Sequence, residues 1–230
     1  MPQVLIVGAG ATGLTLAIEL LRRAIDVRIV DIATGYFSGS RGKGIQPRSI
    51  ELLDMAGLAD EIMANGTLYP FIKLHFGPIG IKAWSLGTRL PPTVDRPYPN
   101  LMMLAQWRTE EILRSRVEAL GGKIELGAGI EALAQTSGDV RVTLTTGEVA
   151  ASEFVVACDG GRSTTRRLLG LQLQGSTVDT KTSIVADLEM EGLDPEFWHA
   201  YPLWRGGLHT LAPLPGGEFF QLQAPESIAA

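Results

Sequence analysis

The sequence predicts an α/β fold with a doubly wound parallel sheet, joined to a second, β-rich region. The opening residues follow the order strand, glycine turn, helix and strand, which is the order of a βαβ unit. From Gln172 onward, short β-type runs alternate with glycine and proline. The 230 residues are 45% hydrophobic and 20% charged, so the chain can bury a globular core.

The first 31 residues supply the βαβ unit. Val4 to Val7 form a short apolar run that stops at a glycine, and the apolar pattern from Leu14 to Ala24 predicts a helix. Val27 to Val30 form a second strand. Because a crossover of this kind is right-handed and joins parallel strands, we expect the two strands to be parallel.

The next segment leaves the parallel sheet. Pro47 to Met55 predicts a helix, with proline in its first turn and Gly57 beyond its end. Residues 68–85 alternate in short runs broken by glycine and proline, which predicts an antiparallel hairpin. A strand is expected over residues 101–105. These residues therefore form an excursion from the α/β domain.

The chain then returns to α/β structure. Trp107 to Leu120 predicts an amphipathic helix, which Gly121 and Gly122 end. Further strands are expected near residues 123–126, 131–135, 140–145 and 153–157, followed by a short helix over residues 163–169. The parallel strands therefore begin near Gln3, Val27, Lys123 and Glu153.

Charge and cysteine content exclude several classes of protein. The chain has 20 Lys and Arg against 25 Asp and Glu, and no block of basic residues that would bind nucleic acid or a membrane surface. No apolar run approaches the roughly 18 residues of a membrane span, and the first residues lack a secretory signal. Cys158 is the single cysteine, which excludes an internal disulfide. We expect a cytoplasmic protein with no nucleic-acid or membrane partner.

A glycine fingerprint lies between the first strand and the first helix. In Gly8-Ala9-Gly10-Ala11-Thr12-Gly13, Gly8 allows the tight turn, Gly10 lets a pyrophosphate approach, and Gly13 allows close packing. The helix N-terminus adds free N–H groups, so we expect Gly8, Gly10, Ala11, Thr12 and Gly13 to bind a dinucleotide. Asp31 follows 18 residues after Gly13, where a carboxylate can bind a ribose hydroxyl. The fingerprint does not distinguish NAD from FAD.

Two further segments carry a family resemblance. Residues 40–58, SRGKGIQPRSIELLDMAGL, and residues 156–163, VACDGGRS, which RRLLG follows at 166–170, resemble segments of class A flavoprotein monooxygenases. This is the para-hydroxybenzoate hydroxylase family, which includes polyketide and rifamycin hydroxylases. The order and spacing of the motifs match over essentially the whole chain. The resemblance implies a Rossmann-like FAD-binding domain, residues 1–70 and 100–177, and a partial substrate domain, residues 71–99 and 178–230.

The resemblance also implies roles for particular residues. Arg41 is expected near the FAD diphosphate or flavin, and Gln106 near the cofactor phosphate or ribitol. Asp159 and Gly160 are expected at the FAD ribitol or ribose. The implied reaction uses NAD(P)H and O2 to hydroxylate an aromatic substrate, either phenolic or polyketide-like. Because the chemistry belongs to the cofactor, we expect no catalytic side chain.

Other features leave alternatives open. His75, His199 and His209 lack metal-ligand spacing, so no metal site is expected. Trp198, Tyr201 and Trp204 are expected either to line an aromatic pocket or to pack in the core. The choice between NADH and NADPH stays open.

The family's third cofactor motif, a Gly-Asp on a further parallel strand, is not found. We therefore expect an amino-terminal portion of a longer enzyme, whose exposed sheet edge favours self-association. One alternative is a non-catalytic remnant that binds FAD or another ADP-containing ligand, or one component of a longer flavoprotein. Another is a flavoprotein dehydrogenase or halogenase, although the halogenase signature Gly-Trp-x-Trp-x-Ile-Pro is missing.

Overall fold

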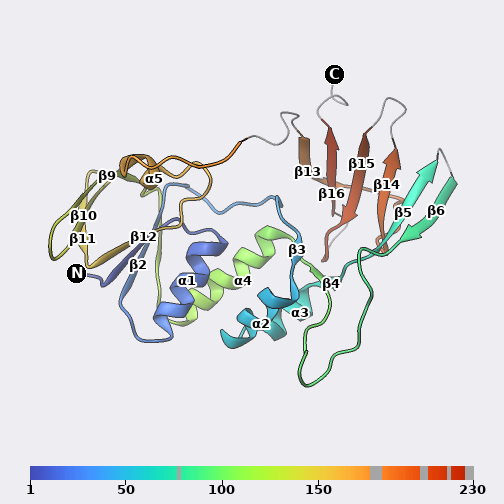
Figure 1. Ribbon diagram of the computed structural model, residues 1–230, viewed down its shortest axis with the longest axis horizontal. Coiled ribbons are helices and arrows are strands. Elements are labelled where there is room, and N and C mark those ends of the chain that lie inside the picture. The colour runs from blue at the N-terminus through green and yellow to red at the C-terminus, as the bar shows by residue number, and fades with distance from the viewer. Residues whose placement is uncertain (77–78, 177–182, 203–206, 217–218, 226–230) are drawn as a thin grey trace. The chain divides into compact units, whose positions relative to one another are not determined.

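The computed structural model describes residues 1–76, 79–176, 183–202, 207–216 and 219–225. Within it the chain forms two compact units, whose elements are labelled in Figure 1. The first unit contains Met1–Phe37 and Glu110–Ser176, and the second contains Ser38–Thr109 and Thr177–Ala230. Each unit is described separately below.

A four-stranded parallel sheet forms the centre of the first unit. Its order is β12 (Phe154–Ala157), β1 (Val4–Val7), β2 (Val27–Asp31) and β8 (Ile124–Leu126). All three pairings are parallel, which confirms the four predicted strands and the doubly wound class. The outer strands β12 and β8 are the edges of this sheet, while self-association through an edge stays a prediction.

Helix α1 (Ala11–Leu21) connects β1 to β2 and lies three residues closer to the N-terminus than predicted. It begins directly after Gly10, because the fingerprint itself forms its first turn. It ends before Ala24, whose φ of 58° is left-handed and interrupts the helix. The sequence pattern therefore located the helix but misplaced both of its ends.

A three-stranded antiparallel sheet packs on the parallel one. It consists of β11 (Val149–Ser152), β10 (Val140–Leu144) and β9 (Ile130–Gln135). Val142 and Leu144 share a buried core with residues of β1 and β2. Strand β11 was not predicted, because only Glu153 separates it from β12. The short helix α5 (Thr164–Leu168) follows β12, as predicted.

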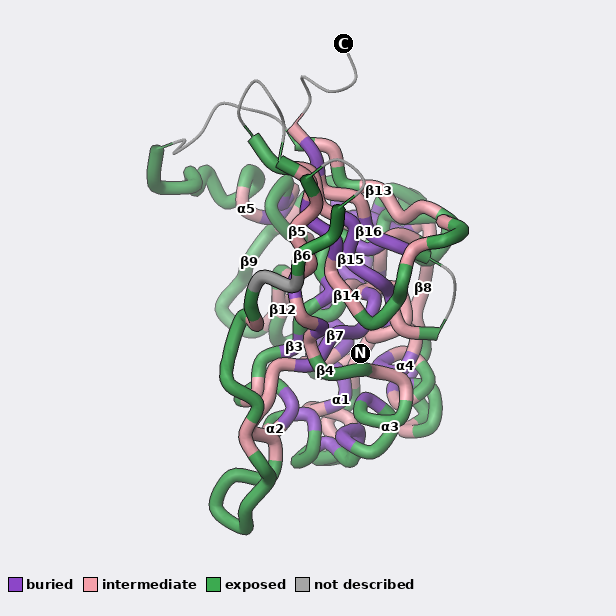
Figure 2. The backbone as a smooth tube through the Cα atoms, turned by 90° about the vertical axis from the view of Figure 1, so that its right-hand side faces the viewer, coloured by how far each residue is buried: buried purple, intermediate pink, exposed green. Residues whose placement is uncertain are grey.

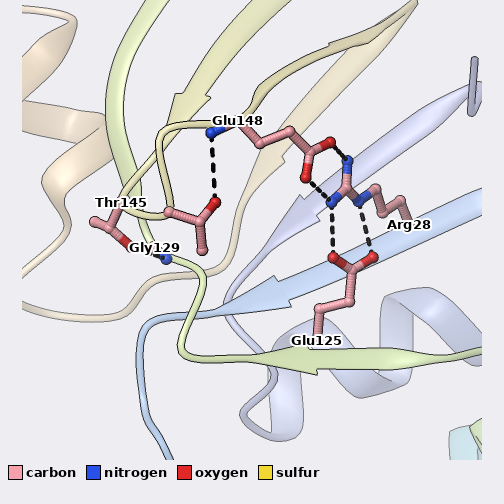
Figure 3. Close-up of polar contacts among 6 residues, drawn as sticks. Arg28, Glu125, Gly129, Thr145 and Glu148 are labelled. Atoms are coloured by element: carbon pink, nitrogen blue, oxygen red, sulfur yellow. Dashed lines mark hydrogen bonds and ion pairs between the residues drawn. The ribbon is translucent and has the colours of Figure 1, made fainter.

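An arginine joins the two sheets of the first unit. Arg28 on β2 donates two hydrogen bonds to Glu125 on β8, of 2.8 and 2.7 Å. It also donates from Nη1 to Glu148 at 2.6 Å, in the turn between β10 and β11 (Figure 3). Both carboxylates favour the charged guanidinium and raise the pKa of Arg28. The network therefore ties the parallel sheet to the antiparallel one.

The second unit is built on a six-stranded sheet. Its strands, in spatial order, are β13 (Ser183–Glu189), β16 (Phe219–Pro225), β15 (Leu208–Pro213), β14 (Phe197–Pro202), β5 (Phe71–Phe76) and β6 (Ile79–Trp84). Strands β5 and β6 form the predicted hairpin, and β14 joins β5 in parallel. Within this sheet the buried residues lie in β14 to β16 and β5, whereas Ile79, Gly80, Ile81 and Trp84 of β6 are exposed (Figure 2).

The same unit contains a small sheet of β3 (Gly44–Ile45), β7 (Met102–Met103) and β4 (Thr67–Leu68). Strand β7 is shorter than predicted, because only its two buried methionines pair with β3 and β4. The predicted helix α2 (Pro47–Met55) is confirmed, and α3 (Ala59–Asn65), which was not predicted, follows Gly57. Helix α4 (Gln106–Ala119) begins in this unit and continues through the first.

The compact units divide the chain at residues 37/38 and 109/110. The predicted functional division lies at 70/71 and 99/100, and its last boundary, 177/178, lies outside the described residues. The assignment of a cofactor domain and a substrate domain therefore stays a prediction. None of the helices in the described part of the chain has the length and apolar character of a membrane-spanning segment.

Candidate functional site

The glycine fingerprint forms the turn from β1 to α1. Gly8 has a φ of 106°, and a side chain there would overlap the Cys158 carbonyl. A side chain on Gly13 would overlap the Gly8 carbonyl oxygen. Gly8 is therefore required where the loop approaches the chain after β12, and Gly13 is required where α1 approaches the loop.

Gly10 differs from the other two glycines, because the space beside it is open. The nearest atom to an added Cβ would be Glu110 Oε1, at 4.0 Å. Gly10 is also the N-cap of α1 and makes no side-chain capping bond, so the first N–H groups of the helix lack the usual cap. Free N–H groups and the positive end of the helix dipole favour a phosphate in this position.

Asp31 ends β2 and reaches the same loop. Its Oδ2 accepts a hydrogen bond from the Ala9 N–H at 2.7 Å, and its Oδ1 accepts one from the Ala33 N–H at 2.8 Å. Each carboxylate oxygen has a second lone pair, so both can still accept a bond from a ribose hydroxyl. The sequence did not indicate that Asp31 also braces the fingerprint.

Asp159 follows β12 and lies beside the fingerprint, since Cys158 contacts both Gly8 and Gly13. Its Oδ2 accepts hydrogen bonds from the N–H and the hydroxyl of Thr165, at 2.9 and 3.0 Å. Burial acts to raise the pKa of Asp159, but hydrogen bonds from Ser163 and Thr165 outweigh it and lower that pKa.

The other oxygen of Asp159, Oδ1, is buried and accepts no hydrogen bond within the described part of the chain. A hydroxyl donor such as a polyol would satisfy it. Gly160, with a φ of 74°, then turns the chain toward α5. An open phosphate position and an unsatisfied carboxylate oxygen thus lie at the carboxyl ends of adjacent strands, which fits a dinucleotide.

In the second unit, the structure brings Arg41 and Gln106 together. Gln106 Oε1, at the start of α4, accepts hydrogen bonds from the backbone N–H groups of Arg41 and Gly42, both at 3.2 Å. The interaction is with the Arg41 backbone, while the Arg41 residue is exposed. Gln106 therefore shapes the segment that carries Arg41, a role that the sequence did not indicate.

The candidate aromatic residues lie on opposite faces of the six-stranded sheet. Trp198 and Tyr201 are three positions apart on β14, so their side chains alternate. Tyr201 stacks between His75 and His209, with centroid distances of 4.4 and 4.9 Å. Trp198 instead lies beside Lys43, whose Nζ is 4.6 Å from the ring centroid. Trp204 lies outside the described residues.

Sequence reasoning missed two buried polar residues on the Trp198 face. Lys43 and Gln221 are 6% and 0% exposed, and Lys43 Nζ donates to Gln221 Oε1 at 2.6 Å. Lys43 lies within the segment that carries the family resemblance, and Gln221 interrupts an apolar strand. A glutamine directly after two phenylalanines in a β-type run was the signal that could have pointed to Gln221.

Comparison with known proteins gives the chain its family. Residues 1–205 match the model of the FAD binding domain. A flavin-dependent monooxygenase from Mycobacteroides abscessus is 38% identical, over 96% of this chain and 48% of the relative. The 6-methylpretetramide 4-monooxygenase of Streptomyces rimosus is also 38% identical, over 83% of this chain and 34% of the relative. The chain thus spans about half or less of the length of these relatives.

Solved structures have the same fold. The flavin-dependent monooxygenase PieE, in complex with FAD and substrate, has a TM-score of 0.81 at 22% identity, covering 100% of this chain and 43% of that chain. The p-nitrophenol 4-monooxygenase of Pseudomonas putida DLL-E4 has a TM-score of 0.79 at 20% identity, covering 98% of this chain and 58% of that chain. These likenesses confirm the predicted fold class, and the sequence relatives confirm the resemblance to flavoprotein monooxygenases. The chain belongs to the FAD binding domain family.

Proposed function

We propose that this chain binds FAD and contributes to a monooxygenase that uses NAD(P)H and O2 to hydroxylate an aromatic substrate, phenolic or polyketide-like. The observation that carries the proposal is the open space beside Gly10 at the uncapped start of α1. A phosphate in that space would accept hydrogen bonds from the backbone N–H groups at the start of α1. The family match over residues 1–205 supports FAD as the dinucleotide.

The residues of the first unit would hold the cofactor through its polar groups. The first turn of α1, with Ala11, Thr12 and Gly13, would bind the diphosphate, and Asp31 would accept a ribose hydroxyl. The free Oδ1 of Asp159, followed by Gly160, would accept a hydroxyl of the ribitol or ribose. When bound, the flavin supplies the redox and oxygen chemistry.

The second unit would contribute Arg41 and the residues that shape its segment. A guanidinium offers forked donors to phosphate oxygens, and Gln106 fixes the backbone on either side of the Arg41–Gly42 peptide. The part of the protein is to bind, orient and exclude water, so no side-chain nucleophile is required. The relatives named as monooxygenases of pentachlorophenol and anhydrotetracycline support an aromatic substrate.

Two measurements on the purified chain test this proposal. Titration of FAD against its own fluorescence is expected to show one site per chain, and ADP is expected to compete. NADH or NADPH oxidation in the presence of FAD is expected to rise on addition of a phenol, with an oxygenated product detected by mass spectrometry. Binding of FAD and ADP without turnover would favour the non-catalytic remnant. Oxidation without an oxygenated product would favour a dehydrogenase, and no FAD binding would refute the proposal.

A further inference from the structure

The segment that carries Arg41 is fixed by hydrogen bonds from three separate elements. Gln106 on α4 accepts from the N–H groups of Arg41 and Gly42. The Leu104 N–H, directly after β7, donates to the Lys43 carbonyl at 2.8 Å. On the third side, Gln221 Nε2 on β16 donates to the Ser40 carbonyl. The backbone of four consecutive residues, 40–43, is therefore held in one conformation.

The side chain of Gln221 makes three hydrogen bonds, two of them to this segment. Its Oε1 accepts hydrogen bonds from Lys43 Nζ at 2.6 Å and from Gln223 Nε2 at 3.0 Å, while its Nε2 donates to Ser40. Gln221 is completely buried in the middle of β16. The Gln221 amide supplies an acceptor and a donor from one planar group, whereas leucine has neither and a glutamate carboxylate has no donor, so neither can make all three bonds.

Lys43 is buried beside an aromatic ring and near a buried carboxylate, and burying its amine costs stability. Lys43 Nζ lies over the Trp198 ring, and Asp187 on β13 is the direct neighbour of Gln221 in the sheet. Both Asp187 carboxylate oxygens are buried and lack a hydrogen-bond partner among the residues that the structure describes. Burial lowers the pKa of Lys43, although the charge of Asp187 acts to raise it.

An apolar core would close this face of the sheet at lower free-energy cost than a buried amine and a buried carboxylate. The polar residues instead specify one position for the segment, because the hydrogen bonds that join Gln221 to Lys43 and Ser40 fix it in one register on β16. A flexible segment would have to be ordered when a ligand binds, which weakens affinity. A segment that is already ordered avoids this loss.

We propose that Gln221 is a positioning residue for Arg41: through Lys43 and Ser40 it fixes the 40–43 segment on β16, so that the segment is already ordered before FAD binds. This inference rests on the proposed function, in which Arg41 contacts the cofactor. Gln221 itself need not touch FAD. Gln221 contacts Ser40 and Lys43, the two ends of the segment, whereas Gln106 contacts the two residues between them.

The test compares Gln221→Leu with Thr210→Val in the full 230-residue chain. Thr210 lies on the same face of the sheet, and its hydroxyl has no hydrogen-bond partner among the described residues, so its removal leaves segment 40–43 untouched. Hydrogen–deuterium exchange without FAD is expected to be at least about tenfold faster at residues 41–43 in Gln221→Leu. FAD affinity is expected to fall about tenfold, while Thr210→Val matches the wild type in both measurements.

The two readouts separate this inference from the proposed function. A wild-type chain that binds no FAD refutes the proposed function and, with it, the role of Gln221 in binding, whereas the exchange data still report whether residues 41–43 are held. Unchanged exchange at 41–43 in Gln221→Leu overturns the inference. Faster local exchange with wild-type FAD affinity overturns it as well, because the contact would then be merely structural.

Two further variants keep the proposal testable if Gln221→Leu does not fold. Gln221→Glu keeps an acceptor for Lys43 but loses the donor to Ser40, so it is expected to lose less FAD affinity than Gln221→Leu. Lys43→Met keeps the hydrogen bond between Gln221 and Ser40. Its exchange at residues 41–43 is therefore expected to rise less than in Gln221→Leu, which loses both bonds. If both variants match the wild type in exchange at 41–43 and in FAD affinity, the positioning role is wrong.

Discussion

The carboxylate of Asp31 accepts a hydrogen bond from the Ala9 N–H at 2.7 Å, so the side chain of the residue that ends β2 holds the loop that follows β1. A residue expected to recognise a ribose therefore also shapes the phosphate-binding turn. Asp31→Ala and Asp31→Asn are therefore expected to differ in their effect on FAD affinity.

Replacing Asp31 with alanine is expected to weaken FAD binding by about 1–3 kcal/mol, because it removes the ribose acceptor and the brace of Ala9 together. Asp31→Asn retains one acceptor oxygen and is expected to lose less affinity. Fluorescence titration with FAD, and competition by ADP, measure both effects. An Asp31→Ala chain with wild-type affinity would place Asp31 outside the site.

Replacing Gly10 with valine is expected to abolish binding of FAD and ADP, because the side chain fills the open space in front of α1. The chain is expected to remain folded, since the added Cβ would be no closer than 4.0 Å to the nearest contacting side chain, that of Glu110. Gly138→Val is the matched control, because the space beside Gly138 is also open. Equal FAD affinity in the two variants would contradict the assignment of the loop.

Lys43→Met tests the buried amine through the pH dependence of stability. Burial lowers the pKa of Lys43 from about 10.5 to about 8, a difference that corresponds to roughly 3 kcal/mol. Between these values the folded protein has released a proton that the unfolded chain still binds, so the wild type gains stability as the pH rises from 8. Below pH 8 both states are protonated and the penalty of burial is complete.

The stability of wild type relative to Lys43→Met is therefore expected to increase by about 2–3 kcal/mol between pH 7 and pH 10. Urea unfolding at several pH values measures the difference, in which the effects of other titrating groups cancel. Parallel stability curves for the two proteins would show that Lys43 titrates normally.

His209→Phe tests how a buried histidine affects stability at low pH. His209 lies on the face of the six-stranded sheet opposite to Trp198. Burial lowers the pKa of His209, and its Nδ1 is buried with no hydrogen-bond partner in the described residues. As the pH falls below about 6.5, the unfolded chain takes up a proton that the folded protein resists, and stability is lost. Phenylalanine keeps the stacking on Tyr201 but cannot bind the proton.

The variant is therefore expected to lose less stability than wild type between pH 7 and pH 5. Thermal unfolding across this range is the measurement. His75, whose pKa burial also lowers, should still titrate in both proteins and provides the shared background. An identical acid profile would mean that His209 does not contribute.

Arg28→Met is expected to destabilise the first unit by about 1 kcal/mol, since Arg28 holds two carboxylates on separate sheets. The loss should shrink at high salt, because screening weakens the ion pairs of the wild type. Urea unfolding at low and high salt tests this, with Arg141→Met as the control for an exposed arginine paired within its own hairpin. A salt-independent loss would indicate packing of the side chain rather than charge.

The cofactor loop was predictable because its residues are close in sequence and follow backbone rules. Gly8 needs a left-handed φ and Gly13 needs close packing, and both constraints can be read from the motif. Helix ends were less accurate, since Ala24 is left-handed without being glycine or asparagine. Strand β11 was missed because a single residue separates it from β12.

Side-chain contacts between distant segments were beyond the sequence. Gln221 and Ser40 lie 181 positions apart, and their hydrogen bond depends on how β16 meets the 40–43 segment. The brace between Asp31 and Ala9 likewise depends on the twist and register of β1 and β2. Motifs give the residue types of a site, while such long-range contacts require the folded chain.

The pairing of β1 with β12 has a consequence for the order in which the chain folds. Val4 pairs with Phe154, so one edge of β1 must wait for a partner that is synthesised 150 residues later. All of β3, β4 and β7 is made in the interval. Contacts of such long range slow folding, and the edge of apolar β1 that does not face β2 is exposed to aggregation meanwhile. Chains cut before residue 157 should therefore aggregate during synthesis, whereas the parallel sheet can close once β12 has emerged.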